Sequence, residues 1–320
     1  MDLSYIVERA KAAPLVHRQN AAKEALQECL LSALAQEGLL AGTAFIGGTA
    51  LRILHQLPRF SEDLDFVWLD GEPDARPWSQ AIKRYLGKIG VTPHLQLGAR
   101  HTDARSGKRT QALYLAAAAP ALGSFARDGL QVSFEFDFDP PAHTVGEVKI
   151  LTLAYGQASI PTLTLPSLLA GKLHILLTRL DREKGRDWYD YLWYRRQEIL
   201  PNVLQLESAI QQSGHTLPAR FWMSYLRRRV QEMNWENLRN DVRPFLENPD
   251  ELSQLNATNM VQLTPPPPFE ELTHELKVEE RRHPLFQAAA DDPVRQDVDQ
   301  RSLEGDKGAI DLDRALRALR

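Results

Sequence analysis

Cysteine is nearly absent from this sequence, which removes disulfide-stabilised folds from consideration. One residue of the 320, Cys29, is a cysteine, and it lies in the apolar helical run ALQECLLSALA. A disulfide within the chain is therefore excluded, and we expect Cys29 to be a buried, unreactive thiol. Zinc is not expected either, because His55, His101 and His174 have no metal-ligand spacing with this cysteine or with one another.

Long apolar runs and an excess of one charge are also missing. The formal net charge of −4 gives no global signal for binding to nucleic acid or to a membrane surface. The first residues, MDLSYIVERAKAAPLV, lack the basic end and apolar block of a secretory signal. The most apolar later run, ALYLAAAAPALGSFA, is short and is interrupted by Pro120. We therefore expect a soluble cytoplasmic protein, in which any RNA-binding surface is local.

The length of the chain allows about two domains, each with its own core. We predict an α+β fold in three segments. Residues 1–164 hold N-terminal helices and a mixed sheet, and residues 165–263 are α-helical. Residues 264–320 begin with the proline-rich connector TPPPPFEEL and continue as a charged tail, which we expect to be partly disordered.

Hydrophobic periodicity predicts the order of the main elements. A long amphipathic helix covers 18–38, and a buried strand, TAFIGG, ends in a glycine turn that leads into a helix over 49–55. The following strand is DLDFVWL. The next expected elements are a helix over 78–88 and strands over 91–99, 110–118 and 130–138, the last of which is expected to end the sheet. One helix is expected from Pro166 to Gly185, a second over RDWYDYLWYRRQEIL, and further helices over 202–247.

The glycine pair of this pattern is the first candidate binding element. Gly47 and Gly48 stand between a strand and a helix, so backbone amides at the helix start can approach an anion without obstruction by a Cβ atom. A triphosphate suits such a loop. On its own, however, a glycine pair before a helix is most often only a turn.

Paired carboxylates are the second candidate element. Asp63 and Asp65 are two apart on a strand, so they point the same way and can share divalent ions, for which Mg²⁺ is expected. The alternating strand VSFEFDFD offers a third carboxylate, either Glu135 or Asp137, and the sequence does not choose between them. Two ions held this way suit nucleotidyl transfer, because one activates the incoming hydroxyl and the other stabilises the leaving pyrophosphate.

Three stretches in order resemble one known family. IGGTALR with RFSEDLDF, then EFDFDPP, then LPSLLAGKLHILLTRLDREKGRDWYDYLW are similar to the AbiEii/AbiGii nucleotidyltransferase-like toxins of bacteria, within the polymerase-β-like superfamily. The resemblance spans roughly residues 40–197. It implies a minimal nucleotidyltransferase core, a helical C-terminal half that completes the active site, NTP as substrate and a cognate antitoxin. Some relatives modify the 3′ end of tRNA and thereby halt translation.

The same resemblance assigns roles to single residues. Gly47, Gly48 and Thr49 match the phosphate loop, and Ser61, Asp63 and Asp65 match the S-x-D-x-D motif. Lys172 matches the family's helix lysine and Asp187 the aspartate of its G-R-D motif.

Physical reasoning adds alternatives for several of these side chains. Lys172 and Arg179 are seven apart, so they are expected to share a helix face and neutralise a triphosphate. Asp187 is a general base or orients the lysine, or it only caps a helix. Arg59, like Arg52, clamps phosphate or forms a structural ion pair.

The expected function is Mg²⁺-dependent transfer of a nucleoside monophosphate from NTP to RNA, with the tRNA acceptor end as first choice. Basic groups in RHTDARSGKR (residues 100–109) and around 182–186, 195–196 and 226–229 favour RNA if the fold gathers them on one side, and the alternative is dispersed, solvated charge. A protein or small-molecule hydroxyl is the alternative acceptor. A second alternative, from a different functional class, is a non-catalytic NTP-binding interaction protein. Trp188, Tyr189, Trp193 and Tyr194 are interpreted as helix packing rather than base stacking.

Overall fold

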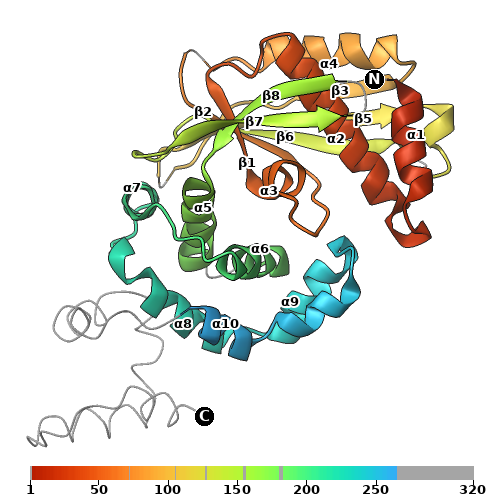
Figure 1. The fold of residues 1–320 in the computed structure, drawn as a ribbon. Coiled ribbons are helices and arrows are strands. Elements are labelled where there is room, and N and C mark those ends of the chain that lie inside the picture. Colours follow the sequence, from red (N-terminus) through yellow and green to blue (C-terminus); the bar gives the residue numbers. More distant parts are fainter. Residues whose placement is uncertain are drawn as a thin grey trace, which may run out of the picture.

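A computed structural model describes residues 2–71, 73–104, 106–126, 128–153, 156–179 and 183–264 (Figure 1). Most of the predicted connector and tail, residues 265–320, lies outside this part of the chain. Within it, no helix has both the length and the apolar character that crossing a membrane requires. The fold is α+β, as predicted from the sequence.

One mixed sheet organises the described residues, with strand order β3-β5-β6-β2-β1-β8-β7 and with β4 paired to β5. The pairs β2–β6 and β1–β8 are parallel, and the other pairs are antiparallel. The strands are β1 Thr43–Ile46, β2 Leu64–Trp68, β3 Thr92–Leu97, β4 His101–Thr102, β5 Arg109–Ala118, β6 Leu130–Asp137, β7 Gly146–Leu153 and β8 Gly156–Leu163.

The sheet does not end at β6, which corrects the expectation from the sequence. The hairpin of β7 and β8 follows, and β8 runs back beside β1, with Phe45 opposite Thr162. This hairpin buries few apolar side chains, among them Leu151 and Ile160, while Val148 and Ile150 on β7 are exposed. The hydrophobic pattern of this sequence is weak because the hairpin lies at one edge of the sheet and is covered on one face only.

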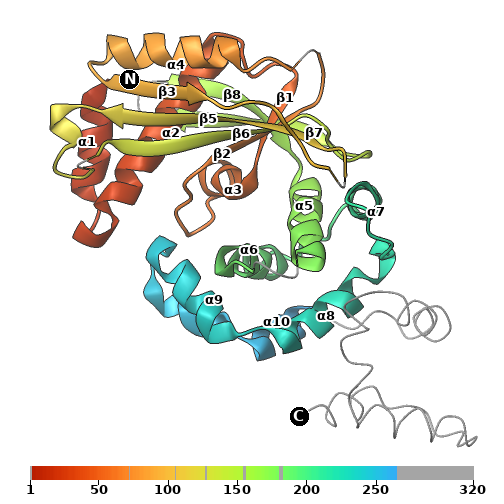
Figure 2. The ribbon, with the colours of Figure 1, turned by 180° about the vertical axis from the view of Figure 1, so that it is seen from behind.

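One face of the sheet is covered by helices from the first part of the chain (Figures 1 and 2). These are α1 Leu3–Ala12, α2 Arg18–Gln36 and α4 Arg76–Lys88. Their apolar side chains form one core with the strand residues Phe66, Phe134 and Phe136, around Trp78 of α4. Because residues alternate along a strand, this packing turns the acidic side chains of β2 and β6 to the opposite face.

The helical half of the chain packs on that opposite face. A second core joins Ala44 and Val67 of the sheet to Leu169 and Trp188 of the helices. The elements on this side are α3 Gly47–His55, α5 Leu165–Thr178, α6 Gly185–Arg196, α7 Val203–Gln212, α8 Trp222–Glu232, α9 Trp235–Val242 and α10 Ala257–Leu263. Short 3-10 turns lie at Leu15–His17, Pro120–Leu122, Ala219–Phe221, Arg243–Phe245 and Pro249–Gln254.

The single helix expected from Pro166 to Gly185 is wrong, because α5 ends at Thr178. Arg179 already has an extended backbone, with φ −89° and ψ 92°. It therefore leaves the helical spiral and does not share a helix face with Lys172. The next helix, α6, begins at Gly185, where the closeness of its partner α9 leaves no room for a side chain: a Cβ atom would lie 1.9 Å from the Leu238 carbonyl oxygen.

Candidate active site

The glycine pair forms the junction between β1 and α3. Gly47 is the first residue of α3 and has a positive φ of +78°, which favours glycine. A Cβ atom on Gly47 would lie 2.1 Å from Oδ2 of Asp65, and one on Gly48 would lie 2.4 Å from Nη2 of Arg59 and 2.9 Å from Oγ of Ser61. The loop thus runs directly against the acidic strand, and a larger residue at either position would have to displace these side chains.

Thr49 and Gln27 hold the entry to β2 in place. Thr49 is fully buried, and its hydroxyl donates to the main-chain carbonyl of Asp63. On the other side of the entry, Nε2 of Gln27 in α2 donates to the carbonyl of Glu62 at 2.8 Å. The two contacts fix the position from which the acidic strand starts.

The carboxylates of β2 and β6 lie side by side on the sheet. Asp65 is directly opposite Glu135 in the parallel register, and Asp63 accepts a 2.5 Å hydrogen bond from the Ser133 hydroxyl. Burial, followed by the charges of Glu135 and Asp63, raises the pKa of Asp65 to about 7. Burial and the charge of Asp63 also raise the pKa of Glu135. The charged forms of Asp65 and Glu135 are therefore disfavoured, first by burial and then by the neighbouring carboxylates.

The geometry distinguishes the two candidates for the third carboxylate. Asp137 is one pair further along the register, opposite Val67, and its Oδ2 lies 2.5 Å from Nζ of Lys108. No cation among the described residues forms an ion pair with Glu135, which lies opposite Asp65. Among the described residues, no three His, Cys, Asp or Glu side chains are gathered closely enough to hold a metal ion as they stand.

Lys172 projects from α5 into a pair of carboxylates on α6. Its Nζ lies 2.7 Å from Oδ1 of Asp187 and 2.9 Å from Oδ2 of Asp190. Burial opposes the charged lysine, but the two carboxylates outweigh it and raise the pKa of Lys172. The ammonium is therefore a fixed positive charge. Together with Lys184 it acts on Asp65, whose pKa both lysines lower.

Asp187 is the third residue of α6 and does not cap it. The N-cap residue is Lys184, whose side chain makes no capping bond. Instead, Oδ2 of Asp241 from α9 accepts from the backbone N–H of Gly185 at 2.8 Å. The carboxylate of Asp187 is thus available to Lys172, which is the contact expected of a residue that orients the lysine.

Asp190 is a central residue that the sequence reasoning did not select. It is fully buried and binds both Nε and Nη2 of Arg59, at 2.6 and 2.7 Å. The third nitrogen of Arg59, Nη1, donates to the carbonyl of Phe60. Arg59 thus has the geometry of the structural ion-pair alternative. A signal was present in the sequence, because Asp187 and Asp190 are three apart on one helix and both can reach the same lysine.

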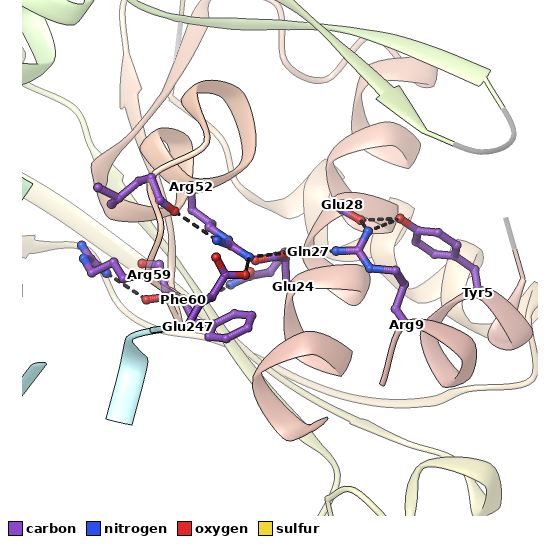
Figure 3. Close-up of polar contacts among 11 residues, drawn as sticks. Tyr5, Arg9, Glu24, Gln27, Glu28, Arg52, Arg59, Phe60 and Glu247 are labelled. Carbon is purple, nitrogen blue, oxygen red and sulfur yellow. Dashed lines mark hydrogen bonds and ion pairs between the residues drawn. The ribbon is translucent and has the colours of Figure 1, made fainter. Parts of the chain in front are cut away.

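The remaining predicted cations divide into two groups. Arg179 and Lys184 act on Glu135 electrostatically and line a small pocket between α5 and α6 with Asp187. Arg52 instead lies between Glu24 of α2 and Glu247, as Figure 3 shows. Its position is that of a structural ion pair.

Most of the predicted RNA-binding arginines make contacts within the helical half. Arg195 donates to the Leu263 carbonyl, Arg227 to that of Val261, and Arg229 pairs with Glu183. The aromatic side chains of α6 are packed as expected, with Trp188, Tyr189 and Tyr194 each 1% exposed. The contacts of these arginines therefore do not support a single basic groove for RNA.

The assembled site combines three features. A side-chain-free backbone loop, a set of mutually repelling carboxylates and a fixed lysine meet at the junction of the sheet with α3, α5 and α6. Such a site can hold a polyphosphate at the loop, neutralise its charge with the lysine and recruit divalent cations to the acids.

Comparison with known proteins gives one family match and two structural similarities. A family model described as nucleotidyl transferase AbiEii toxin, type IV TA system, matches residues 29–275. JHP933 from Helicobacter pylori is 14% identical, with a TM-score of 0.46, covering 90% of this chain and 98% of that one. A putative nucleotidyltransferase from H. pylori is 16% identical, with a TM-score of 0.45, covering 83% and 98%. No curated protein matches this chain.

Proposed function

The chain belongs to the AbiEii family of nucleotidyltransferase toxins of type IV toxin–antitoxin systems, and we propose that it transfers a nucleoside monophosphate from NTP to the 3′ acceptor end of tRNA. It is accordingly a transferase with an NTP substrate and a cognate antitoxin. Both proposed substrates are cytoplasmic molecules, so cytoplasmic action is part of this proposal. Inhibition of translation would follow, because an altered acceptor end cannot be charged normally.

The observation that carries the proposal is the contact of Gly47 with Asp65. It brings an anion-binding helix start within reach of carboxylates that can take a divalent cation. A triphosphate at Gly47, Gly48 and Thr49 would therefore place its reacting phosphorus beside the acids. We also assign Ser61, beside Gly48, and Arg179, near Glu135, to contacts with the phosphates.

Magnesium fits the donor set of this site. Asp63, Asp65 and Glu135 provide hard oxygen donors, and the pKa values of Asp65 and Glu135 are raised by burial and then by neighbouring negative charge, which a divalent cation offsets. We propose that these three residues hold it, with two ions as the expected number, and that Asp137 serves Lys108 instead. When bound, Mg²⁺ supplies charge neutralisation for the leaving pyrophosphate and lowers the pKa of the attacking hydroxyl.

The other residues position the substrate. We propose that Lys172 neutralises the triphosphate, since it stays protonated, and that Asp187 holds its ammonium in place. Arg59 supports the loop from behind through its contact with Gly48, rather than clamping phosphate. In this arrangement the protein contacts orient the substrate, which is the main requirement of phosphoryl and nucleotidyl transfer.

The test is transfer of label from each of four α-labelled NTPs to total bacterial tRNA in the presence of magnesium. The control is the double variant Asp63→Ala/Asp65→Ala. Label on tRNA that disappears in the control supports the proposal and identifies the preferred base. Label on a protein or small molecule, with none on RNA, would show that the acceptor is that molecule and not tRNA. NTP binding without any transfer would contradict catalysis.

A further inference from the structure

The catalytic face of the sheet is open over β3, β5 and β6. Side chains on this face are exposed to solvent in each of these strands, as the pattern of burial shows: they include His94, Gln96, Tyr114, Gln131 and Glu135. Helices α1, α2 and α4 cover only the opposite face, where Leu113 and Leu115 are buried. A solvent-exposed surface therefore continues from the acids across three strands.

Tyr114 is an unusual residue in this surface. It is 54% exposed, and it is the aromatic side chain among the large hydrophobic residues that are exposed in the described part of the chain. Its same-face neighbours along β5 are Ala112 and Ala116, both small. The ring thus stands free of bulky neighbours on its own strand, and the core packing does not explain it.

The register connects Tyr114 to the acids in one row across the sheet. Tyr114 is directly opposite Gln96 of β3 on one side and Ser133 of β6 on the other. Ser133 in turn donates its hydroxyl to Asp63. Two strand spacings separate β5 from β2, so Tyr114 lies about 10 Å from Asp63 along this row.

The order of strands decides which nucleotide can reach the ring. The glycine loop follows β1, the acids lie in β2 and β6, and Tyr114 follows in β5, so the acids separate the loop from the ring. A triphosphate bound at the loop leaves the β5 side free for the attacking substrate. We propose that Tyr114 stacks on an unpaired base at the 3′ end of the acceptor RNA, beside the amide of Gln96.

This inference rests on the proposed function, because it assigns an RNA acceptor to the same site. Stacking on an exposed aromatic ring suits a single-stranded end, since every base presents a π-face and no particular sequence is needed. The neighbouring amide offers both a donor and an acceptor to a base edge. The base of the NTP could use the same chemistry, and the experiment separates the two sources.

The test measures steady-state transfer with full-length protein. Tyr114→Ala is expected to raise KM for tRNA about tenfold, while KM for NTP and the melting temperature stay unchanged. Tyr114→Trp is expected to keep KM for tRNA within about twofold of the unmodified protein, because the larger ring still stacks. The matched control is Val148→Ala on the far edge strand, where an equally exposed side chain is removed. An unchanged KM for tRNA would overturn the inference, and so would a rise confined to KM for NTP.

A second measurement does not depend on catalysis. Binding of a short single-stranded RNA is expected to weaken about tenfold in Tyr114→Ala and not in Val148→Ala. Binding that depends on Tyr114 without any transfer to RNA would refute the proposed transfer to RNA and would leave Tyr114 only as a stacking residue for single-stranded RNA. Transfer to tRNA together with RNA binding that is indifferent to Tyr114 would do the reverse.

Discussion

Arg59 and Asp190 are 131 residues apart in the sequence and form a buried two-point ion pair, with Nε–Oδ1 at 2.6 Å and Nη2–Oδ2 at 2.7 Å. Their side chains are 3% and 0% exposed. The pair joins the entry of the acidic strand to α6, which carries Asp187. It therefore links the two halves of the chain at the site itself.

Removing Arg59 is expected to leave the buried carboxylate of Asp190 only partly compensated, by Lys172. We predict that Arg59→Ala lowers the free energy of unfolding by about 3–5 kcal/mol. The matched control is Arg76→Ala, which breaks the exposed pair with Asp74 and should leave the free energy of unfolding nearly unchanged. Urea denaturation of both variants measures the difference, and similar losses for the two would contradict a structural role for Arg59.

Two helical glycines provide a second matched comparison. Gly185→Ala places a Cβ atom against the Leu238 carbonyl, so we expect a loss of roughly 3 kcal/mol or more as α6 and α9 separate. Gly87→Ala in α4 meets nothing within 4 Å and should be neutral or stabilise by up to about 1 kcal/mol. Thermal melts of both variants test this. A stable Gly185→Ala protein would show that the helix contact is looser than described.

The raised pKa of Asp65 predicts how stability varies with pH in the absence of divalent cations. Its carboxyl has a pKa of about 7 when folded and an ordinary value of 3.8 when unfolded. Between these values the folded protein holds a proton that the unfolded chain releases, so the free energy of unfolding falls as pH rises from 4 to 7. We expect Asp65→Asn to remove this loss and to stabilise the protein at pH 8 by on the order of 2 kcal/mol.

Melting in EDTA at pH 5 and pH 8 measures this effect. Asp128→Asn, at an exposed position, is the control and should follow the unmodified protein at both pH values. Equal stability of Asp65→Asn and the unmodified protein at pH 8 would mean that the folded protein does not disfavour the charged form of Asp65.

The third carboxylate can be identified by two isosteric changes. Glu135→Gln is expected to reduce kcat on the order of 100-fold or more, because Glu135 is opposite Asp65. Asp137→Asn keeps the size of the side chain and loses only the contact with Lys108, so at least about half the activity should remain. Initial rates of labelling at saturating NTP decide the matter, and the reverse ranking would assign the role to Asp137.

Asp187 can be assigned by the size of its effect. The amide oxygen in Asp187→Asn can still accept from Lys172, so a residue that only orients the lysine should lose about tenfold or less in kcat. A general base would lose about 100- to 10,000-fold and would also lose the acidic limb of the pH–rate profile. We expect the smaller loss, with a larger one in Asp187→Ala, which cannot hold the ammonium.

The sequence predicted the elements that carry the site more successfully than the contacts within it. Gly47 and Gly48 before a helix, and Asp63 and Asp65 at the next strand, were readable because each depends on residues close together in the chain. The division into segments at 164 and 263 stays a prediction. In the structure, sheet residues such as Ala44 and Val67 share one core with the helical half.

Contacts between distant segments were beyond the sequence. The pairing of Arg59 with Asp190 requires knowledge of how α6 meets the entry to β2, and no local pattern encodes it. Likewise, the choice of Glu135 over Asp137 depends on a register, since both residues alternate onto the same face of β6. The break after Thr178 was missed because the stretch from Arg179 to Lys184 contains no proline or glycine that would end the helix before Gly185.

The spread of the site along the chain has a consequence during synthesis. The loop at Gly47 and the acids of β2 leave the ribosome early, but Lys172 and its carboxylate partners emerge more than a hundred residues later. A nascent or prematurely ended chain that lacks α6 therefore carries the acids of β2 and β6, but it lacks the carboxylates that bind Lys172 and Arg59. The active site of this toxin is therefore incomplete on the ribosome until α6 has been synthesised and has left the exit tunnel.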